Sequence, residues 1–102
     1  MAQGNRKVLK SMSDAALEEI PQLMTAIRQA IANGDHAKLR LTAHTLRGSM
    51  RCFGANQICQ HAAKLEDLAR KGEIAGAETI LADMEAEIEQ LTLVLSDSLH
   101  EI

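Results

Sequence analysis

The chain has 102 residues, of which 46% are hydrophobic, and this length accommodates one domain with one modest core. Because it has one aromatic residue, Phe53, and one proline, the core must be built from Leu, Ile, Ala and Met, a composition that favours helices over a sheet. The formal net charge of -3 argues against a general nucleic-acid-binding protein, since no basic excess is available for phosphate contacts.

The first segment with a helical pattern runs from about Arg6 to Asn33, after residues 1–5, which we expect to be frayed. Its apolar residues recur every three or four positions, as along one face of an amphipathic helix: Val8, Met12, Ala16, Ile20, Leu23, Ile27 and Ile31. Pro21 has no amide hydrogen to donate to the preceding turn. It therefore predicts either one helix kinked at that point or a second helix that starts afresh, capped by Ser13 and Asp14.

The pair Asn33-Gly34 predicts the end of this segment, and Asp35 is a suitable cap for a second helix that extends to about Phe53. When this helix is projected at about 100° per residue, its apolar residues fall on one narrow stripe. We assign that stripe to the core: Leu39, Ala43, Leu46, Met50 and Phe53. The connection is so short that the two helices must be antiparallel neighbours.

His44 lies well round from the core stripe, so we expect its ring to face outward. Its neighbours one helical turn away are Arg40 and Arg47, which place the imidazole among cations. Gly48 follows on the same face, although a glycine inside a helix costs about 1 kcal/mol relative to alanine. Bare backbone at this position would let another protein reach the imidazole.

The run Gly54-Ala55-Asn56 interrupts the helical pattern, and Asn56 is the expected N-cap of a third helix that ends at Lys71-Gly72. Its core residues are Ile58, Ala62, Leu65 and either Leu68 or Ala69. Glu66 and Arg70 lie at one edge of this stripe, one turn apart, and could simply form an ion pair on the surface.

The last helix is expected from about Ala77 to Leu99. Its buried face comprises Ala77, Leu81, Met84, Ile88, Leu91 and Leu95, and an acidic row directed to water comprises Asp83, Glu85, Glu87 and Glu89. Four helices with short turns predict an all-α, antiparallel up-down-up-down four-helix bundle, with or without a short or kinked extra N-terminal helix. We expect residues 1–102 to form this single domain.

The region around His44 resembles the histidine-containing phosphotransfer (HPt) domains of multistep phosphorelays. The resemblance rests on His44-Thr45-Leu46-Arg47-Gly48-Ser49, Gly54-Ala55, Leu65-Glu66 and Arg70, in the spacing of that family. It covers most of the chain and several separated positions. The sequence departs from the family pattern at Arg47, where lysine is usual, and at Met50, where a small residue is common.

The resemblance implies that His44 accepts a phosphoryl group from an aspartyl phosphate of a receiver domain and passes it to another receiver. The neutral imidazole would attack in line through Nε2, since histidine with its ordinary pKa near 6.5 has a free ring nitrogen at neutral pH. Glu66, by its position in the family pattern, would hold Nδ1–H, and Arg47 would offset the negative charge of the phosphoryl group.

The resemblance also implies the surroundings of the reaction. The residues that dock the partner would be Arg40, Leu41, Gly48, Arg51 and Arg70, although Arg51 could equally belong to a solvated helix face. Magnesium is expected in the acidic pocket of the receiver, so we expect this chain to bind no metal or other cofactor. No P-loop or glycine-rich nucleotide loop is present in the sequence, and we therefore predict a phosphocarrier without kinase activity of its own.

Two other functions remain open at this stage. A chemotaxis-kinase-type phosphotransfer domain would share the bundle and the glutamate but would take its phosphate from an ATP-bound kinase domain. That family often has a second histidine three residues before the glutamate, where this chain has Ala63. A non-catalytic helical adaptor would use the face around His44 only for docking.

The ends of the chain and its cysteines bear on location and context. Residues 1–7 are polar and lack an apolar signal region, no apolar run approaches a membrane span, and Cys52 and Cys59 match neither C-x-x-C nor a zinc pattern. We expect a cytoplasmic monomer with a reduced pair of small core cysteines. The start at Gly4-Asn5-Arg6 resembles the interior of longer family members, so we expect a module of, or a partner to, a hybrid sensor histidine kinase.

Overall fold

A computed structural model describes the backbone of residues 2–100 and the side-chain surroundings of residues 14–96. The elements in chain order are α1 (Ala2–Asn33), α2 (His36–Arg51), α3 (Asn56–Lys71), the short 3-10 helix η1 (Ile74–Gly76) and α4 (Ala77–His100). No strand occurs within residues 2–100. The predicted all-α class is therefore confirmed, and η1 is an addition that the sequence pattern did not predict.

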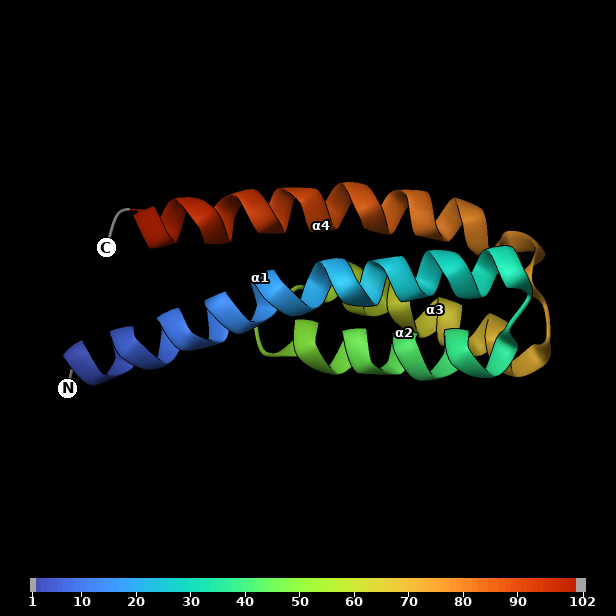
Figure 1. Cartoon of the computed structure of the whole chain (residues 1–102), viewed down its shortest axis with the longest axis horizontal. Coiled ribbons are helices and arrows are strands. Elements are labelled where there is room, and N and C mark those ends of the chain that lie inside the picture. The colour runs from blue at the N-terminus through green and yellow to red at the C-terminus, as the bar shows by residue number, and fades with distance from the viewer. Residues whose placement is uncertain (1, 101–102) are drawn as a thin grey trace.

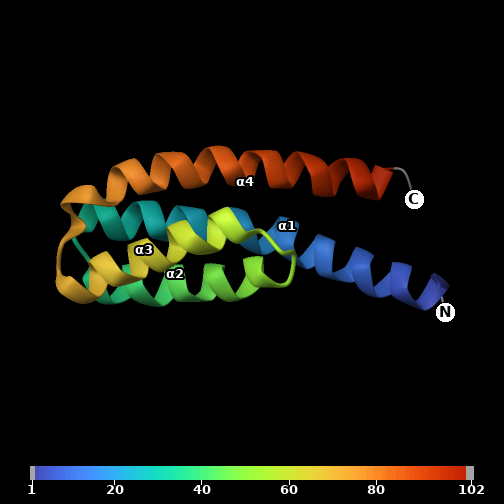
Figure 2. The ribbon, with the colours of Figure 1, turned by 180° about the vertical axis from the view of Figure 1, so that it is seen from behind.

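The four α-helices form a bundle in which each helix runs opposite to the one before it (Figure 1). The view from behind in Figure 2 shows the same alternation, with α3 now in front of α1. Helix α2 packs most extensively against α3, and α4 closes the bundle by packing on both α3 and α1. Helices α1 and α4 extend past the turn between α2 and α3 (Figures 1 and 2), so the site-bearing helices form the shorter half of the molecule.

Helix α1 is one continuous helix of 32 residues with Pro21 in its interior. The alternative of a fresh start at Ser13 and Asp14 is wrong, and no separate N-terminal helix occurs in the described range. Residues 2–5, which we expected to be frayed, belong to α1, while Met1 lies outside the described residues. Side chains up to residue 13 are likewise outside the description, which includes the predicted core positions Val8 and Met12.

The helix boundaries follow the predicted caps at three of four places. Gly34 and Gly72 have φ angles of +68° and +73°, the left-handed conformation that glycine adopts without strain, and the Asp35 side chain accepts a hydrogen bond from the Lys38 amide at 3.1 Å. The turn between α2 and α3 differs from the expectation. Helix α2 ends at Arg51, Ala55 is the N-cap of α3 without a side-chain bond, and Asn56 is already helical.

One hydrophobic core runs through the bundle, and the predicted stripes supply most of it. Its largest fully buried side chains come from all four α-helices: Ile27, Leu39, Leu46, Met50, Leu65 and Met84. Met24, Ala30 and Thr42 are also buried, which we did not predict. Phe53 lies beyond the end of α2 and is only partly buried.

Several polar expectations need correction. Cys52 is exposed and Cys59 is half-buried, so the two are not a core pair, although both are free thiols. Two members of the acidic row on α4 pair with other helices instead of facing only water. Glu85 contacts Arg28 of α1 at 2.9 Å, and Glu87 contacts His61 of α3 at 2.5 Å.

Candidate functional site

His44 projects from the middle of α2 with 62% of its side chain exposed, while the preceding residue, Ala43, is fully buried. This arrangement follows from the helical phase, because the apolar stripe fixes which face of α2 turns inward. The imidazole is therefore held on a packed helix but open to an incoming molecule.

Glu66 of α3 contacts the inner edge of this ring. Its Oε1 lies 3.1 Å from His44 Nδ1, and only 11% of its side chain is exposed. The sequence placed Glu66 at the edge of the core stripe, whereas the packing of α2 on α3 buries it. A buried carboxylate in contact with Nδ1 favours a proton on that nitrogen and leaves the Nε2 lone pair free.

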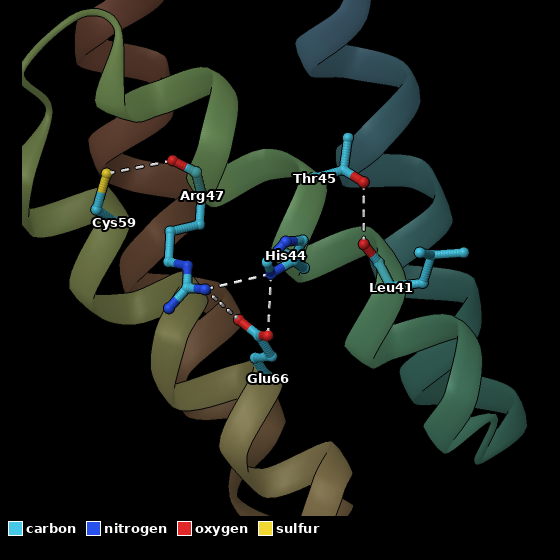
Figure 3. Close-up of polar contacts among 6 residues, drawn as sticks. All are labelled: Leu41, His44, Thr45, Arg47, Cys59 and Glu66. Atoms are coloured by element: carbon cyan, nitrogen blue, oxygen red, sulfur yellow. Dashed lines mark hydrogen bonds and ion pairs between the residues drawn. The ribbon is translucent and has the colours of Figure 1, made fainter.

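Arg47, one turn after His44 on α2, completes a cluster of three side chains shown in Figure 3. Its Nη2 lies 3.3 Å from Glu66 Oε2 and 3.2 Å from His44 Nδ1. Glu66 Oε2 is buried and accepts no well-aligned hydrogen bond in the described part of the chain, so the guanidinium at 3.3 Å offsets its charge.

The two contacts of His44 Nδ1 exclude one another as hydrogen bonds. A carboxylate can only accept and a guanidinium can only donate, so Nδ1 either gives a proton to Glu66 or takes one from Arg47. In the first arrangement Oε1 accepts the Nδ1 proton and Oε2 lies 3.3 Å from the Arg47 guanidinium, so neither oxygen of the buried carboxylate faces a lone pair. The second leaves Oε1 facing a lone pair, which is costly for a buried charge. The geometry therefore favours Nδ1–H and a free Nε2.

The sequence of this chain matches the Hpt domain family over residues 11–93. The chain belongs to the Hpt domain family. Domains of this family are histidine phosphocarriers that interact with receiver domains in phosphorelays. No curated protein matches the sequence.

The crystal structure of histidine-containing phosphotransfer protein B (HptB) from Pseudomonas aeruginosa PAO1 is similar to this Hpt domain in fold. The two superpose with a TM-score of 0.87, covering 91% of this chain and 81% of that chain, at 24% sequence identity. The likeness shows that the two chains share the same helical-bundle fold.

The surroundings of His44 in this Hpt domain are open. Leu41, one turn before it, is 68% exposed and accepts a hydrogen bond from the Thr45 hydroxyl through its carbonyl at 3.0 Å (Figure 3). A Cβ at Gly48 would meet no atom within 4 Å, so no neighbouring group in the chain requires a glycine there. Arg51 is exposed beyond it.

The structure brings Arg40 and Arg70 to the surroundings of His44 but does not pair Arg70 with Glu66. Arg40 and Arg70 are exposed and line one concavity together with His44 and Glu66. The alternative in which Glu66 pairs with Arg70 is wrong, because Glu66 pairs with Arg47. The sequence analysis did not predict this Arg47–Glu66 pair. The one signal that could have indicated it is the general preference of arginine for carboxylate partners.

One further hydrogen bond joins α3 to α2 next to the cluster. The Cys59 thiol of α3 donates to the Arg47 carbonyl of α2 at 3.6 Å (Figure 3).

Among the side chains of residues 14–96, no group of three His, Cys, Asp or Glu residues is arranged to hold a metal ion. No helix in the described range is both long enough and apolar enough to cross a bilayer.

Proposed function

We propose that this Hpt domain accepts a phosphoryl group from the aspartyl phosphate of one receiver domain onto His44 Nε2 and passes it to the aspartate of a second receiver. The single observation that supports attack by Nε2 is the contact of 3.1 Å between Nδ1 of the exposed His44 and the buried carboxylate of Glu66. It leaves Nε2 as the ring nitrogen with a free lone pair.

The bonds formed and broken in this phosphoryl transfer require no cofactor from this chain. The Nε2 lone pair attacks phosphorus in line, the bond between phosphorus and the aspartyl oxygen breaks, and the aspartate leaves as a carboxylate. The imidazole becomes cationic and keeps its proton on Nδ1, where Glu66 stabilises the new positive charge. The reverse sequence of steps delivers the phosphoryl group to the next aspartate, with magnesium supplied by the receiver's acidic pocket.

Arg47 has two roles in this proposal. It holds the carboxylate of Glu66 in place through the ion pair of 3.3 Å, and its charge offsets that of the phosphoryl group.

The open face formed by Leu41, Gly48 and Arg51, together with Arg40 and Arg70, docks the receiver. A single copy of the chain provides this whole face, so we propose that it works as a monomer, within or beside a hybrid sensor histidine kinase.

The test is label transfer from a panel of phosphorylated receiver domains, with His44→Gln as the matched control. Acid-labile label on the wild-type chain and its absence in His44→Gln are expected. Labelling only by an ATP-bound kinase domain would instead indicate a chemotaxis-type domain. Receiver binding without any label would indicate a helical adaptor and contradict the proposal.

A further inference from the structure

A groove runs along the surface between α2 and α3 on one side of His44. The concavity beside the ring is lined by Arg40, Leu41, His44, Glu66 and Arg70. The adjoining concavity is lined by His36, Ala37, Arg40, Ala69 and Arg70. Arg40 and Arg70 line both concavities, which therefore adjoin in one depression. We call the second of them the cationic groove and define it by His36, Ala37, Arg40, Ala69 and Arg70.

The cationic groove carries positive charge that the chain does not neutralise. Within residues 14–96, neither Arg40 nor Arg70 forms an ion pair. The nearby Lys71 differs, because Asp67 pairs with it at 3.1 Å. The one carboxylate that lines the depression, Glu66, is already engaged by Arg47 and His44. Two exposed guanidinium groups, one from α2 and one from α3, suit planar carboxylates, which arginine binds through two parallel hydrogen bonds.

We infer that the cationic groove receives an acidic segment of the receiver domain. In the complex, this segment lies along α2 and α3 to one side of His44. The inference rests on the proposed function and adds to it the charge of the receiver segment that contacts the Arg40 and Arg70 side of the docking face. On the other side of the ring, helix α2 offers Gly48, Arg47, which Glu66 pairs with, and Arg51. The arginines without an ion pair among residues 14–96 are therefore unevenly distributed around the nucleophile. Charge complementarity of this kind speeds encounter and excludes partners that lack the acidic segment.

The experiment compares two double variants that remove equal charge from the same two helices. Arg40→Gln/Arg70→Gln alters the cationic groove. Lys38→Gln/Lys64→Gln alters exposed residues of α2 and α3 that do not line it. Transfer from a labelled receiver is measured at low protein concentration between about 0.1 and 1 M salt, a range over which the screening length falls from about 10 to about 3 Å.

We expect the groove variant to transfer label about tenfold more slowly at low salt, with the difference shrinking at high salt, while the control variant stays close to wild type. Equal rates in both double variants would overturn the inference alone. Each protein is also treated with phosphoramidate, a small phosphodonor that reports on His44 without a docking partner. Loss of this labelling in the groove variant would overturn the inference, because the arginines would then act on the phosphoryl group itself.

A wild-type chain that no receiver labels would overturn the proposed function and, with it, the assignment of the groove. That outcome is distinct from the previous ones because it appears before any variant is made. Circular dichroism of both double variants establishes that they are folded.

Discussion

At the scale of single residues, the reactivity of His44 depends on which of two neighbours controls Nδ1. Glu66 Oε1 and Arg47 Nη2 lie at nearly the same distance from it, 3.1 and 3.2 Å, yet they require opposite tautomers. The carboxylate prevails because its second oxygen engages the arginine. Glu66 is therefore a positioning residue in two senses, since it orients the ring and pairs with the guanidinium that would otherwise donate to Nδ1.

We predict that Glu66→Ala switches His44 toward the Nε2–H tautomer, because Arg47 is then free to donate to Nδ1. Transfer should fall about ten- to hundredfold, the effect typical of losing a partner that orients a metal-ligating histidine. The double variant Glu66→Ala/Arg47→Ala should recover part of the Nδ1–H form, and Glu66→Gln should be milder than alanine because its amide oxygen still accepts a proton. Nitrogen-detected NMR measures the tautomer. An unchanged tautomer in Glu66→Ala would show that the competition does not exist.

His44→Gln should abolish phosphate acceptance and change the free energy of unfolding by no more than about 0.5 kcal/mol, because the side chain is largely exposed. Label transfer and denaturant unfolding measure the two effects separately. Label retained in this variant would assign the phosphate to another residue.

The sequence predicted correctly those side chains whose burial or exposure depends only on their position around the helix. The outward direction of His44 and the burial of Leu39, Ala43 and Leu46 follow from one repeating pattern. The burial of Glu66 and its pairing with Arg47 depend on the rotation of α3 relative to α2. No local pattern in either helix contains that rotation, so the sequence offered Arg70, one turn away on the same helix, as the ion-pair partner of Glu66.

At the scale of elements, α2 contains a glycine that its own packing does not require. Gly48→Gln should raise the free energy of unfolding by about 0.5–1 kcal/mol, because the added Cβ meets open space and glycine is a poor helix former. Receiver-dependent transfer should fall, since the longer side chain obstructs the approach to His44. Gly48→Ala is the matched control, with a similar gain in stability and a smaller loss of transfer. Unchanged transfer in Gly48→Gln would refute the steric role.

The cap at the start of α2 provides a second test at this scale. Asp35→Ala removes the oxygen that accepts the Lys38 amide hydrogen and should lower the free energy of unfolding by about 0.5–2 kcal/mol. Thermal unfolding followed by circular dichroism checks this. A loss below the error of the measurement would mean that water replaces the cap without cost.

Element boundaries were predictable from sequence where a residue has one strong local role. Gly34, Asp35 and Gly72 occupy the cap positions expected of them. Asn56 does not, because the N-cap preference of asparagine is only about 1 kcal/mol, and α3 begins one residue earlier with Ala55 as its N-cap. Pro21 was ambiguous for a physical reason, since packing of the long α1 against its neighbours can outweigh the loss of one backbone hydrogen bond.

At the scale of the whole molecule, one core connects all four α-helices, so stability should be a property of the entire bundle. Ile27→Ala, at a fully buried position of α1 outside the His44, Glu66 and Arg47 cluster, should lower the free energy of unfolding by about 2–5 kcal/mol through the cavity it creates. Phosphate acceptance by the folded fraction should not change. Denaturant unfolding should show a single transition. Two separated transitions would indicate that the helix pairs are independent units.

The position of the site within the chain has a consequence for the order of folding. His44 and Glu66 are 22 residues apart on consecutive antiparallel helices, and the α2–α3 pair has the most extensive packing in the bundle. The entropy of closing a loop grows with the logarithm of its length, and proteins with such local contacts fold in microseconds to milliseconds. Helices α1 and α4 come from opposite ends of the chain, so their contact closes the longest loop. We therefore expect the phosphate-accepting cluster to assemble before the terminal helices meet.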